Sequence, residues 1–424
     1  MDTLRFDLLA KALAHAGTRR CVLRLLAALP LAGVATLFGK ESDAARRHHR
    51  TLRHHRDKQR GQVQEQRKHK KHKKKRKTPS SLVSPSPTCA QTCAGCCTGE
   101  SCQTGNNEAA CGANGAPCAV CSGVQWTCQS GACQCDVCDH GCAYDSVQAA
   151  VADAAGPTTI RICAGTYHED VTIDRHLTLI GAGDGDGPGD TILKGTGNGS
   201  VITVNPQLNV TLQALRITGG NAPGGGIYTT LLDTVTLRHC TVSGNMASVG
   251  GGIFIRGTLT LDASHVTANE AAQGGGIYCQ FTNPNSVVTL QNGSTVTKNT
   301  ANTGGGISSA SCQLTLLSGS SVNGNTAKLL DSGGVANTGT LTLIASEIAN
   351  NTAATVGGGV YNGVGAQVTL LDGSRITGNE ASPTEGSGGG MYNKGTVHPE
   401  GGTISGNSPD QCVDDGGTGC PPSP

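Results

Sequence analysis

The side chains best suited to acid–base chemistry in this sequence are Arg238, His239, Asp262 and His265. They lie in two neighbouring repeats of the chain, with Arg238 and Asp262 24 residues apart. An imidazole and a carboxylate that meet on one surface can remove a proton from a sugar and return it. This group therefore predicts, as an alternative, a polysaccharide lyase or glycoside hydrolase that acts on acidic polysaccharide. We favour the other interpretation, a solvated polar surface without catalysis.

Paired carboxylates for glycoside hydrolysis are not suggested by the acidic residues. Asp262 and Asp372 fall in one column of the repeat alignment, four coils apart. At a strand spacing of about 4.8 Å, that is roughly 19 Å, whereas a glycosidase pair is separated by about 5 to 10 Å. The same objection applies to Glu270 and Glu380.

A short glycine-rich stretch offers three oxygen ligands of the kind that calcium prefers, Asp184, Asp186 and Asp190. The stretch lacks a downstream glutamate that could bind the ion through both oxygens, and a glycine-rich turn is expected there in any case. We therefore expect no cofactor, and keep calcium as the weaker alternative.

Five aromatic residues each follow an inward-facing aliphatic residue, so alternation along the strand points them outward. This set, the aromatic column, consists of Tyr228, Phe254, Tyr278, Tyr361 and Tyr392, and is interrupted by Ser308 and Ala336. Exposed aromatic rings at strand spacing could stack on sugar rings. The column is therefore our candidate binding surface, and a structural stack that stiffens the wall is the alternative.

These residues are positioned by a repeat in which a β-branched residue, two spacers and an asparagine recur. The asparagines are Asn245, Asn269, Asn299, Asn325, Asn351, Asn379 and Asn407, with Asn221 as a looser first copy. From Asn221 onward their spacings are 24, 24, 30, 26, 26, 28 and 28 residues. A period of that size with short β-rich segments predicts a solenoid of stacked coils.

Each repeat contains three short strand-like segments whose aliphatic residues form inward columns. The asparagines can form a ladder of amides at one turn, and the glycine triplets that follow allow positive φ and close backbone approach. A further inward column of small residues consists of Cys240, Ser264, Ser294, Ser320, Ser346 and Ser374. We therefore interpret Cys240 as a structural substitute for serine.

The first 45 residues are typical of an export signal. Residues 18–24 resemble the twin-arginine motif through Arg19 and Arg20, and an apolar run and a small-residue cleavage site follow. Residues 46–77 contain 16 of the 32 Lys and Arg residues, so we expect a disordered basic segment. From residue 78 onward, 10 Lys and Arg oppose 24 Asp and Glu, a net charge of −14.

This division of charge suggests a basic segment that contacts an anionic envelope polymer. We expect no nucleic-acid partner, because no aromatic interleaving or nucleic-acid motif accompanies the basic residues. Membrane contact is expected only through the export signal, if it is not cleaved.

A Pro/Ser linker at 78–88 precedes a cysteine-rich module at 89–141, and 13 of the 20 cysteines lie between residues 89 and 142. Such density predicts disulfides in an oxidising compartment, hence a secreted or cell-surface protein. Zinc is the alternative for the paired cysteines of the module. Outside it we expect the pairs Cys142–Cys163, which flank a helix, and Cys412–Cys420. The solenoid is assigned to 142–411 and a C-terminal tail to 412–424.

Two stretches carry a resemblance to known families. Residues 146–183, with Ala-Gly-Thr-Tyr at 164–167, resemble the start of right-handed parallel β-helix proteins, in which a short helix caps the first coil. Residues 217–407 are similar to the repeats of polymorphic outer-membrane proteins, although Ile or Val replaces the aromatic residue of that pattern. This resemblance implies display at the cell surface and adhesion. The family's C-terminal membrane barrel is not expected here.

The sequence thus predicts an all-β protein: a right-handed parallel β-helix of about nine coils with an N-terminal capping helix. A disulfide-rich module and a disordered basic segment precede it. The expected function is non-catalytic binding of extracellular polysaccharide or an anionic envelope polymer. The further alternatives are the enzyme described above and a structural envelope spacer.

Overall fold

The computed structural model describes residues 89–98, 135–139, 142–282, 286–383 and 386–421, together with short segments between 101 and 133. The expected export signal with Arg19 and Arg20, the basic segment and the linker lie outside the described residues. In the part of the chain that is described, no helix is long and apolar enough to cross a bilayer.

The described parts of the cysteine-rich module are small elements tied by disulfides. They are α3 (Cys89–Thr92), β1 (Cys96–Thr98), β2 (Ser101–Gln103), β3 (Asn106–Asn107), β4 (Ala110–Cys111), β5 (Cys128–Gln129) and β6 (Ala132–Cys133). The pairs β1–β2, β3–β4 and β5–β6 are antiparallel. Cys89 is bonded to Cys97 and Cys93 to Cys102, so covalent bonds hold a segment that is too small to bury a core of its own.

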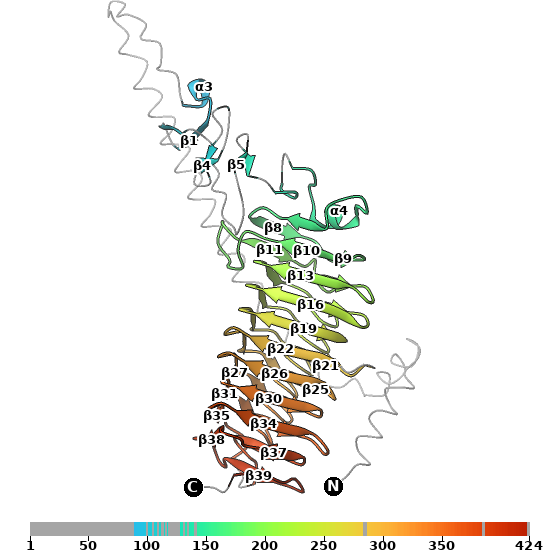
Figure 1. Ribbon diagram of the computed structural model, residues 1–424, viewed down its shortest axis with the longest axis vertical. Coiled ribbons are helices and arrows are strands. Elements are labelled where there is room, and N and C mark those ends of the chain that lie inside the picture. Colours follow the sequence, from blue (N-terminus) through green and yellow to red (C-terminus); the bar gives the residue numbers. More distant parts are fainter. Residues whose placement is uncertain are drawn as a thin grey trace, which may run out of the picture. The chain divides into compact units, whose positions relative to one another are not determined.

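The rest of the described chain is a parallel β-solenoid with three ten-stranded sheets (Figure 1). From the first to the last strand of a sheet the chain makes about nine turns, as expected. Sheet 1 consists of β7 (Thr159–Arg161), β10 (Leu177–Ile180), β13 (Asn209–Gln213), β16 (Asp233–Arg238), β19 (Gly257–Asp262), β22 (Val287–Gln291), β26 (Gln313–Leu317), β30 (Thr340–Ile344), β34 (Gln367–Leu371) and β37 (Thr396–His398).

Sheet 2 follows sheet 1 along each coil. It consists of β8 (Gly165–His168), β11 (Thr191–Lys194), β14 (Arg216–Thr218), β17 (Thr241–Ser243), β20 (His265–Thr267), β23 (Thr295–Thr297), β27 (Ser321–Asn323), β31 (Glu347–Ala349), β35 (Arg375–Thr377) and β38 (Thr403–Ser405).

Sheet 3 completes each coil. It consists of β9 (Val171–Ile173), β12 (Ile202–Val204), β15 (Ile227–Thr229), β18 (Ile253–Ile255), β21 (Ile277–Gln280), β25 (Ile307–Ala310), β29 (Val335–Asn337), β33 (Val360–Asn362), β36 (Met391–Asn393) and β39 (Cys412–Asp414). Three coils carry an extra short strand between sheets 2 and 3, namely β24 (Thr300–Ala301), β28 (Thr326–Ala327) and β32 (Thr352–Ala353).

The predicted aliphatic columns form the core. Ile227, Ile253 and Ile277 are in register in sheet 3, and all three are fully buried. Leu237 with Leu261 in sheet 1 and Val242 with Val266 in sheet 2 continue the same pattern. Because every coil places an aliphatic residue at the same point of each strand, one apolar interior runs along the stack. The solenoid and its repeat are thus confirmed, and its right-handed winding stays a prediction.

The asparagine ladder joins successive coils inside the wall. Each ladder asparagine accepts hydrogen bonds at Oδ1 from the backbone N–H and the Nδ2 of the asparagine one coil earlier, for example Asn269 Nδ2 to Asn299 Oδ1 at 3.0 Å. At the C-terminal end Gln411 Oε1 accepts from Asn407 instead. Asn221 is not a member: it pairs with Met246 and is exposed, and Gly220 N–H fills the ladder position by bonding Asn245.

Two different constraints require the glycine triplets. Gly250 has φ +60°, which a side chain adopts with strain. Gly252 has an ordinary φ, but a Cβ there would lie 2.7 Å from the carbonyl oxygen of Gly276 in the next coil. The first glycine therefore makes the turn, and the third allows adjacent coils to approach.

At the N-terminal end lies α4 (Val147–Ala152), which contributes Val147, Ala150 and Val151 to the core cluster. Ser146 accepts from Ala149 N–H, and both carboxylate oxygens of Glu169 accept from the first N–H groups of the helix at 2.8 Å. These contacts satisfy donors that a helix start leaves unpaired. That α4 caps the core stays a prediction.

The predicted Cys142–Cys163 disulfide is wrong, because Cys163 is bonded to Cys135 and Cys142 to Cys138. The cause is the segment before α4. Val137 pairs with Ile162 and accepts the Cys163 N–H at 3.0 Å, which brings Cys135 beside Cys163. Val137 is fully buried in the solenoid core, so the segment assigned to the cysteine-rich module reaches into the first coil.

At the C-terminal end, too, the solenoid boundary differs from the one expected from the sequence, which assigned residues 412–424 to a tail. Cys412–Asp414 is β39, the last strand of sheet 3, so the solenoid extends past residue 411. Cys412 is bonded to Cys420. Residues 415–420, the C-terminal hook, return onto β37, where the Val397 N–H donates to the Thr418 carbonyl at 2.9 Å.

Candidate functional site

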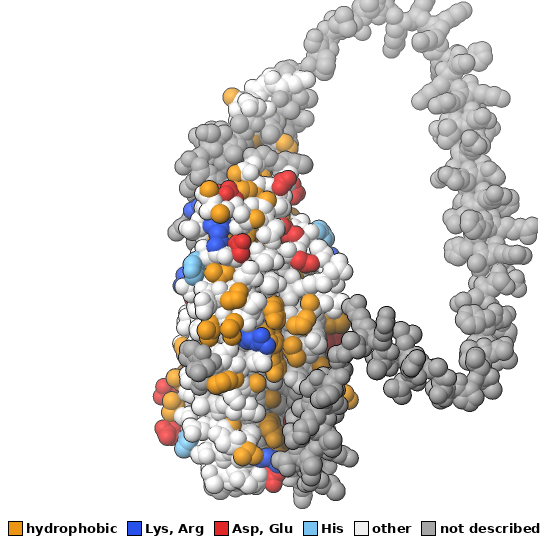
Figure 2. Space-filling model, turned by 90° about the vertical axis from the view of Figure 1, so that its right-hand side faces the viewer, with side chains coloured by type: hydrophobic (Ala, Val, Ile, Leu, Met, Phe, Trp, Pro, Cys, Tyr) orange, Lys and Arg blue, Asp and Glu red, His pale blue; other side chains and the backbone are white. Residues whose placement is uncertain are grey.

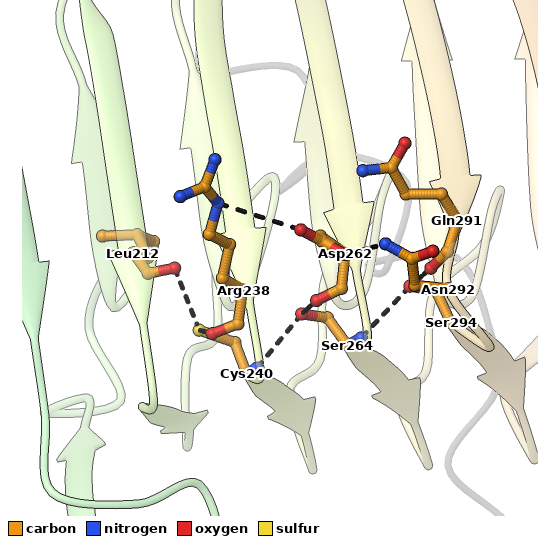
Figure 3. Close-up of polar contacts among 8 residues, drawn as sticks. All are labelled: Leu212, Arg238, Cys240, Asp262, Ser264, Gln291, Asn292 and Ser294. Carbon is orange, nitrogen blue, oxygen red and sulfur yellow. Dashed lines mark hydrogen bonds and ion pairs between the residues drawn. The ribbon is translucent and has the colours of Figure 1, made fainter. Parts of the chain in front are cut away.

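The first candidate site is the polar group around Asp262, which lies at the end of β19 (Figure 3). Asp262 Oδ1 accepts from Asn292 Nδ2 at 2.6 Å, and Oδ2 faces Arg238 Nε at 3.8 Å. The exposed His265 bonds Thr295 Oγ1 through Nδ1 at 2.8 Å. His239 is exposed in the turn after β16, with φ 49°, and its N–H donates to the Asp262 carbonyl at 3.0 Å.

The structure thus brings the predicted residues onto one surface but gives them other partners. Both oxygens of Asp262 are held by an amide and a guanidinium, and His265 is paired with a threonine from the next coil. A general base needs a free acceptor within reach of the substrate proton. The arrangement is that of a surface network of polar side chains.

The alignment of Asp262 with Asp372 is wrong by one residue. In the register of sheet 1, the column that contains Asp262 continues through Gln291, Leu317 and Ile344 to Leu371. Asp372 lies one residue later, in the turn after β34, with φ 50°. By contrast, Glu270 and Glu380 do share a column and lie four coils apart. The three coils between them each place a threonine in this column.

The calcium candidates do not converge. Asp184 Oδ2 accepts from Thr241 Oγ1 at 2.8 Å, and Asp190 Oδ2 accepts from Gly187 N–H at 2.9 Å. Among the described residues, the groups of three side chains with ligand atoms within 4.8 Å of one another are cysteines. These groups are Cys89, Cys93 and Cys97, and Cys135, Cys142 and Cys163, and all six are in disulfides.

Cys240 occupies the small-residue column and lies fully buried (Figure 3). Its backbone N–H donates to Ser264 Oγ at 3.1 Å, as the Ser264 N–H does to Ser294 Oγ, and its thiol points to the Leu212 carbonyl at 3.3 Å. Burial raises the pKa of the thiol to about 12. A thiol that stays protonated is a poor nucleophile, so Cys240 has the contacts of a structural residue.

The second candidate site is the aromatic column on sheet 3. Figure 2 shows the face formed by this sheet, where hydrophobic side chains form a stripe along the solenoid. The rings stack on one another: Tyr228 with Phe254 at 5.1 Å between centroids, Phe254 with Tyr278 at 5.5 Å, and Tyr361 with Tyr392 at 6.0 Å. The column is therefore a stack of three rings and a stack of two.

Stacking changes what the column offers to a ligand. Phe254 is only 4% exposed, because Tyr228 and Tyr278 cover its two faces and Arg256 lies 5.1 Å from its centroid. The expectation of five exposed rings is thus wrong for Phe254, whereas the four tyrosines are partly exposed. Arg256 is held in place by its Nε bond to Gln280 Oε1 at 2.7 Å.

Charged side chains also border the stack of two rings. Lys394 lies 5.6 Å from the Tyr392 centroid and pairs with Asp415 at 2.9 Å. The Tyr392 hydroxyl donates to the same carboxylate. Burial, followed by this hydrogen bond, raises the pKa of Tyr392 to about 12. The Tyr392 side chain is thus anchored to the C-terminal hook.

Sheet 3 contains a second ladder, which we did not predict from the sequence. Asn337 Nδ2 donates to Asn362 Oδ1, Asn362 Nδ2 to Asn393 Oδ1, and Asn393 Nδ2 to Asp414 Oδ1, at 2.9, 2.7 and 2.6 Å. A signal was present, since each asparagine lies two residues after the inward aliphatic residue of its strand. In the preceding coils this column continues as Ser309 and then Cys279, which is bonded to Cys312.

Comparisons of this chain with protein-family models, curated proteins and solved structures gave no match.

Proposed function

We propose that this protein is an exported, non-catalytic binding protein of the cell surface or extracellular space, which contacts polysaccharide or an anionic envelope polymer. The observation that carries the proposal is the aromatic column on sheet 3, whose four tyrosines are partly exposed on a rigid parallel sheet. A tyrosine ring combines an apolar face with a polar hydroxyl and loses little entropy when a ligand binds.

The surroundings of the column suit a ligand rich in hydroxyl groups. Arg256 and Gln280 at one stack, and Lys394 with Asp415 at the other, place donors and acceptors beside the rings. Sugars need both kinds of contact, because their ring faces carry C–H groups and their edges carry hydroxyls. The basic segment predicted at 46–77 would add attraction for polyanions.

The disulfides support export. Six are present among the described residues, and they occur in the cysteine-rich module, at both ends of the solenoid and in its middle. Disulfides persist in oxidising compartments and are rare in the cytosol.

The experiment incubates the protein with a panel of uronic and neutral polysaccharides and measures both retention and product release. We expect retention without turnover, and we expect EDTA to leave it unchanged. Tyr278→Ala and Tyr361→Ala should each weaken retention by about tenfold, or ~1.4 kcal/mol.

His239→Ala and Asp262→Ala serve as matched controls, because they alter the polar group on another face and should not change retention. Product release that either substitution abolishes would support the lyase or hydrolase instead. If no polysaccharide on the panel is retained, the binding proposal fails and the structural spacer is favoured.

A further inference from the structure

The interruption of the aromatic column has a defined geometry. In register, Tyr278 is followed by Ser308, then Ala336, then Tyr361. Two small residues thus separate the stack of three rings from the stack of two. We refer to Ser308 and Ala336, with the tyrosines on either side, as the column gap.

Among the described residues, ring faces without a neighbouring ring occur at the two ends of the column, where Tyr228 lies next to Thr203 and Tyr392 next to Val413, and at the column gap. At the column gap alone, two such faces lie opposite each other. Inside each stack, a ring face is covered by the next ring, as both faces of Phe254 show. Tyr278 has a neighbour on the Phe254 side, and Tyr361 on the Tyr392 side. Their other faces are turned toward Ser308 and Ala336, whose side chains carry no ring to cover them.

The width of the column gap follows from the coil spacing. Three strand spacings of about 4.8 Å separate Tyr278 from Tyr361, or roughly 14 Å. Carbon atoms in contact lie about 3.5 to 4 Å apart. A ring stacked on each tyrosine would leave about 6 Å between the two stacked rings, so the gap has room for two sugar rings, one against each tyrosine.

We propose that the column gap is a saccharide-binding subsite, in which Tyr278 and Tyr361 each stack on a sugar ring. This rests on the proposed function and locates its contact. The polar groups at the gap favour a saccharide over an apolar ligand: the Ser308 side chain lies on its floor, and Gln280 follows Tyr278 by two residues on the same face. An apolar ligand would bury these groups without hydrogen bonds, which is costly.

Charged side chains accompany each of the two stacks that flank the column gap, Arg256 at Phe254 and Lys394 at Tyr392. Burial raises the pKa of Tyr361, and Lys394, which lies 5.6 Å from the centroid of the neighbouring Tyr392 ring, opposes this shift. Burial also raises the pKa of Tyr278, and Arg256 opposes the shift. Arg256 beside the first stack and Lys394 beside the second offer donors for hydroxyl groups.

To test the proposal, substitutions introduce aromatic rings into the column gap. In the double variant Ser308→Phe with Ala336→Phe, the stacks should become continuous, and the free faces of Tyr278 and Tyr361 should be covered. The probes are oligogalacturonates and cello-oligosaccharides of two to six sugars, titrated calorimetrically into the full-length protein. We expect the dissociation constant for the bound series to rise tenfold or more. The series that binds distinguishes uronic from neutral sugars.

The matched control is Thr203→Phe, which adds the same side chain to the same column beyond Tyr228. It should leave the dissociation constant unchanged. If the double variant does not fold, as judged by circular dichroism, Tyr278→Leu and Tyr361→Leu replace it and should each weaken binding.

The outcomes separate this inference from the function on which it rests. If the unmodified protein binds a series and the double variant binds it equally well, the column gap is not the subsite and the binding function stands. If the unmodified protein binds neither of the two oligosaccharide series and no polysaccharide of the panel, both proposals are overturned. A matching loss with Thr203→Phe would also contradict the inference, because the effect would not be specific to the gap.

Discussion

At the scale of single residues, the buried asparagines hold neighbouring coils together. Asn325 is fully buried and accepts from Asn299 N–H and Nδ2 at 2.9 and 3.0 Å. Its own Nδ2 donates to the Val296 carbonyl and to Asn351 Oδ1, both at 2.9 Å. One side chain thus satisfies backbone groups of the coil before it, where water cannot reach.

We predict that Asn325→Ala lowers the free energy of unfolding by about 3 kcal/mol, because it leaves the Asn299 N–H buried without a partner and removes the side-chain bonds to the Val296 carbonyl and to Asn351. Asn323→Ala is the matched control. It removes an amide of the same strand segment that points outward and bonds the exposed Asn350 at 3.3 Å, and should cost less than about 1 kcal/mol. Urea denaturation measures both variants, and equal losses would contradict the ladder's role.

At the scale of elements, a short segment returns onto the last coil at the C-terminal end of the solenoid. The C-terminal hook pairs with β37 through Thr418 and is tied by the Cys412–Cys420 bridge. Asp415 connects it to the wall through Tyr392 and Lys394. An open coil end would expose unpaired strand edges that other chains could join, so such segments protect the stack.

The hook should respond to pH through Asp415. The Tyr392 hydroxyl, followed by Lys394, holds the pKa of this carboxyl below its usual value. The stabilisation is therefore present above the ordinary pKa of 3.8 and is lost as the pH falls through the lower folded value. We predict that Tyr392→Phe raises the pKa of Asp415 toward 3.8, as measured by NMR titration of the carboxyl carbon.

Tyr228→Phe is the control for this titration, since Tyr228 lies in the other stack, and should leave the pKa of Asp415 unchanged. An unchanged pKa in Tyr392→Phe would show that Lys394 alone sets it.

At the scale of the whole solenoid, each coil contacts its nearest neighbours through the same columns. Stability is then a sum of coil and interface contributions, and a complete coil is an exchangeable unit. Asn245 and Asn269 are 24 residues apart and occupy equivalent positions of adjacent coils.

We predict that deletion of residues 246–269 gives a shorter protein that still folds, because Asn245 would meet Asn299 in register. Deletion of residues 246–257 removes half a coil with β18 and should destabilise the protein much more, because the coil at the junction would lack its sheet 3 strand and could not pair with its neighbours there. Circular dichroism and thermal unfolding compare the two. Equal damage from both deletions would mean that the coils are not independent units.

Much of this architecture could be derived from the residues alone. The period of the asparagines and the alternation of Ile, Leu and Val define the coils, the three sheets and the outward direction of the aromatic column. The prediction succeeds because equivalent positions of successive coils have the same burial and the same backbone geometry. The residue pattern of one repeat therefore describes how every coil packs on the next. The extra column at Asn337, Asn362 and Asn393 was equally visible, two residues beyond each inward aliphatic residue.

Other features depended on how separate segments approach one another in space. Cys163 pairs with Cys135 because a strand-like segment before α4 pairs with the first coil. Phe254 is buried because outward-facing rings of adjacent strands stack on one another. The Asp262 carboxylate is already hydrogen-bonded, because the Asn292 side chain donates to it from the next coil. Repetition determines backbone positions, whereas side-chain directions and contacts outside the repeat depend on competition among all the partners within reach.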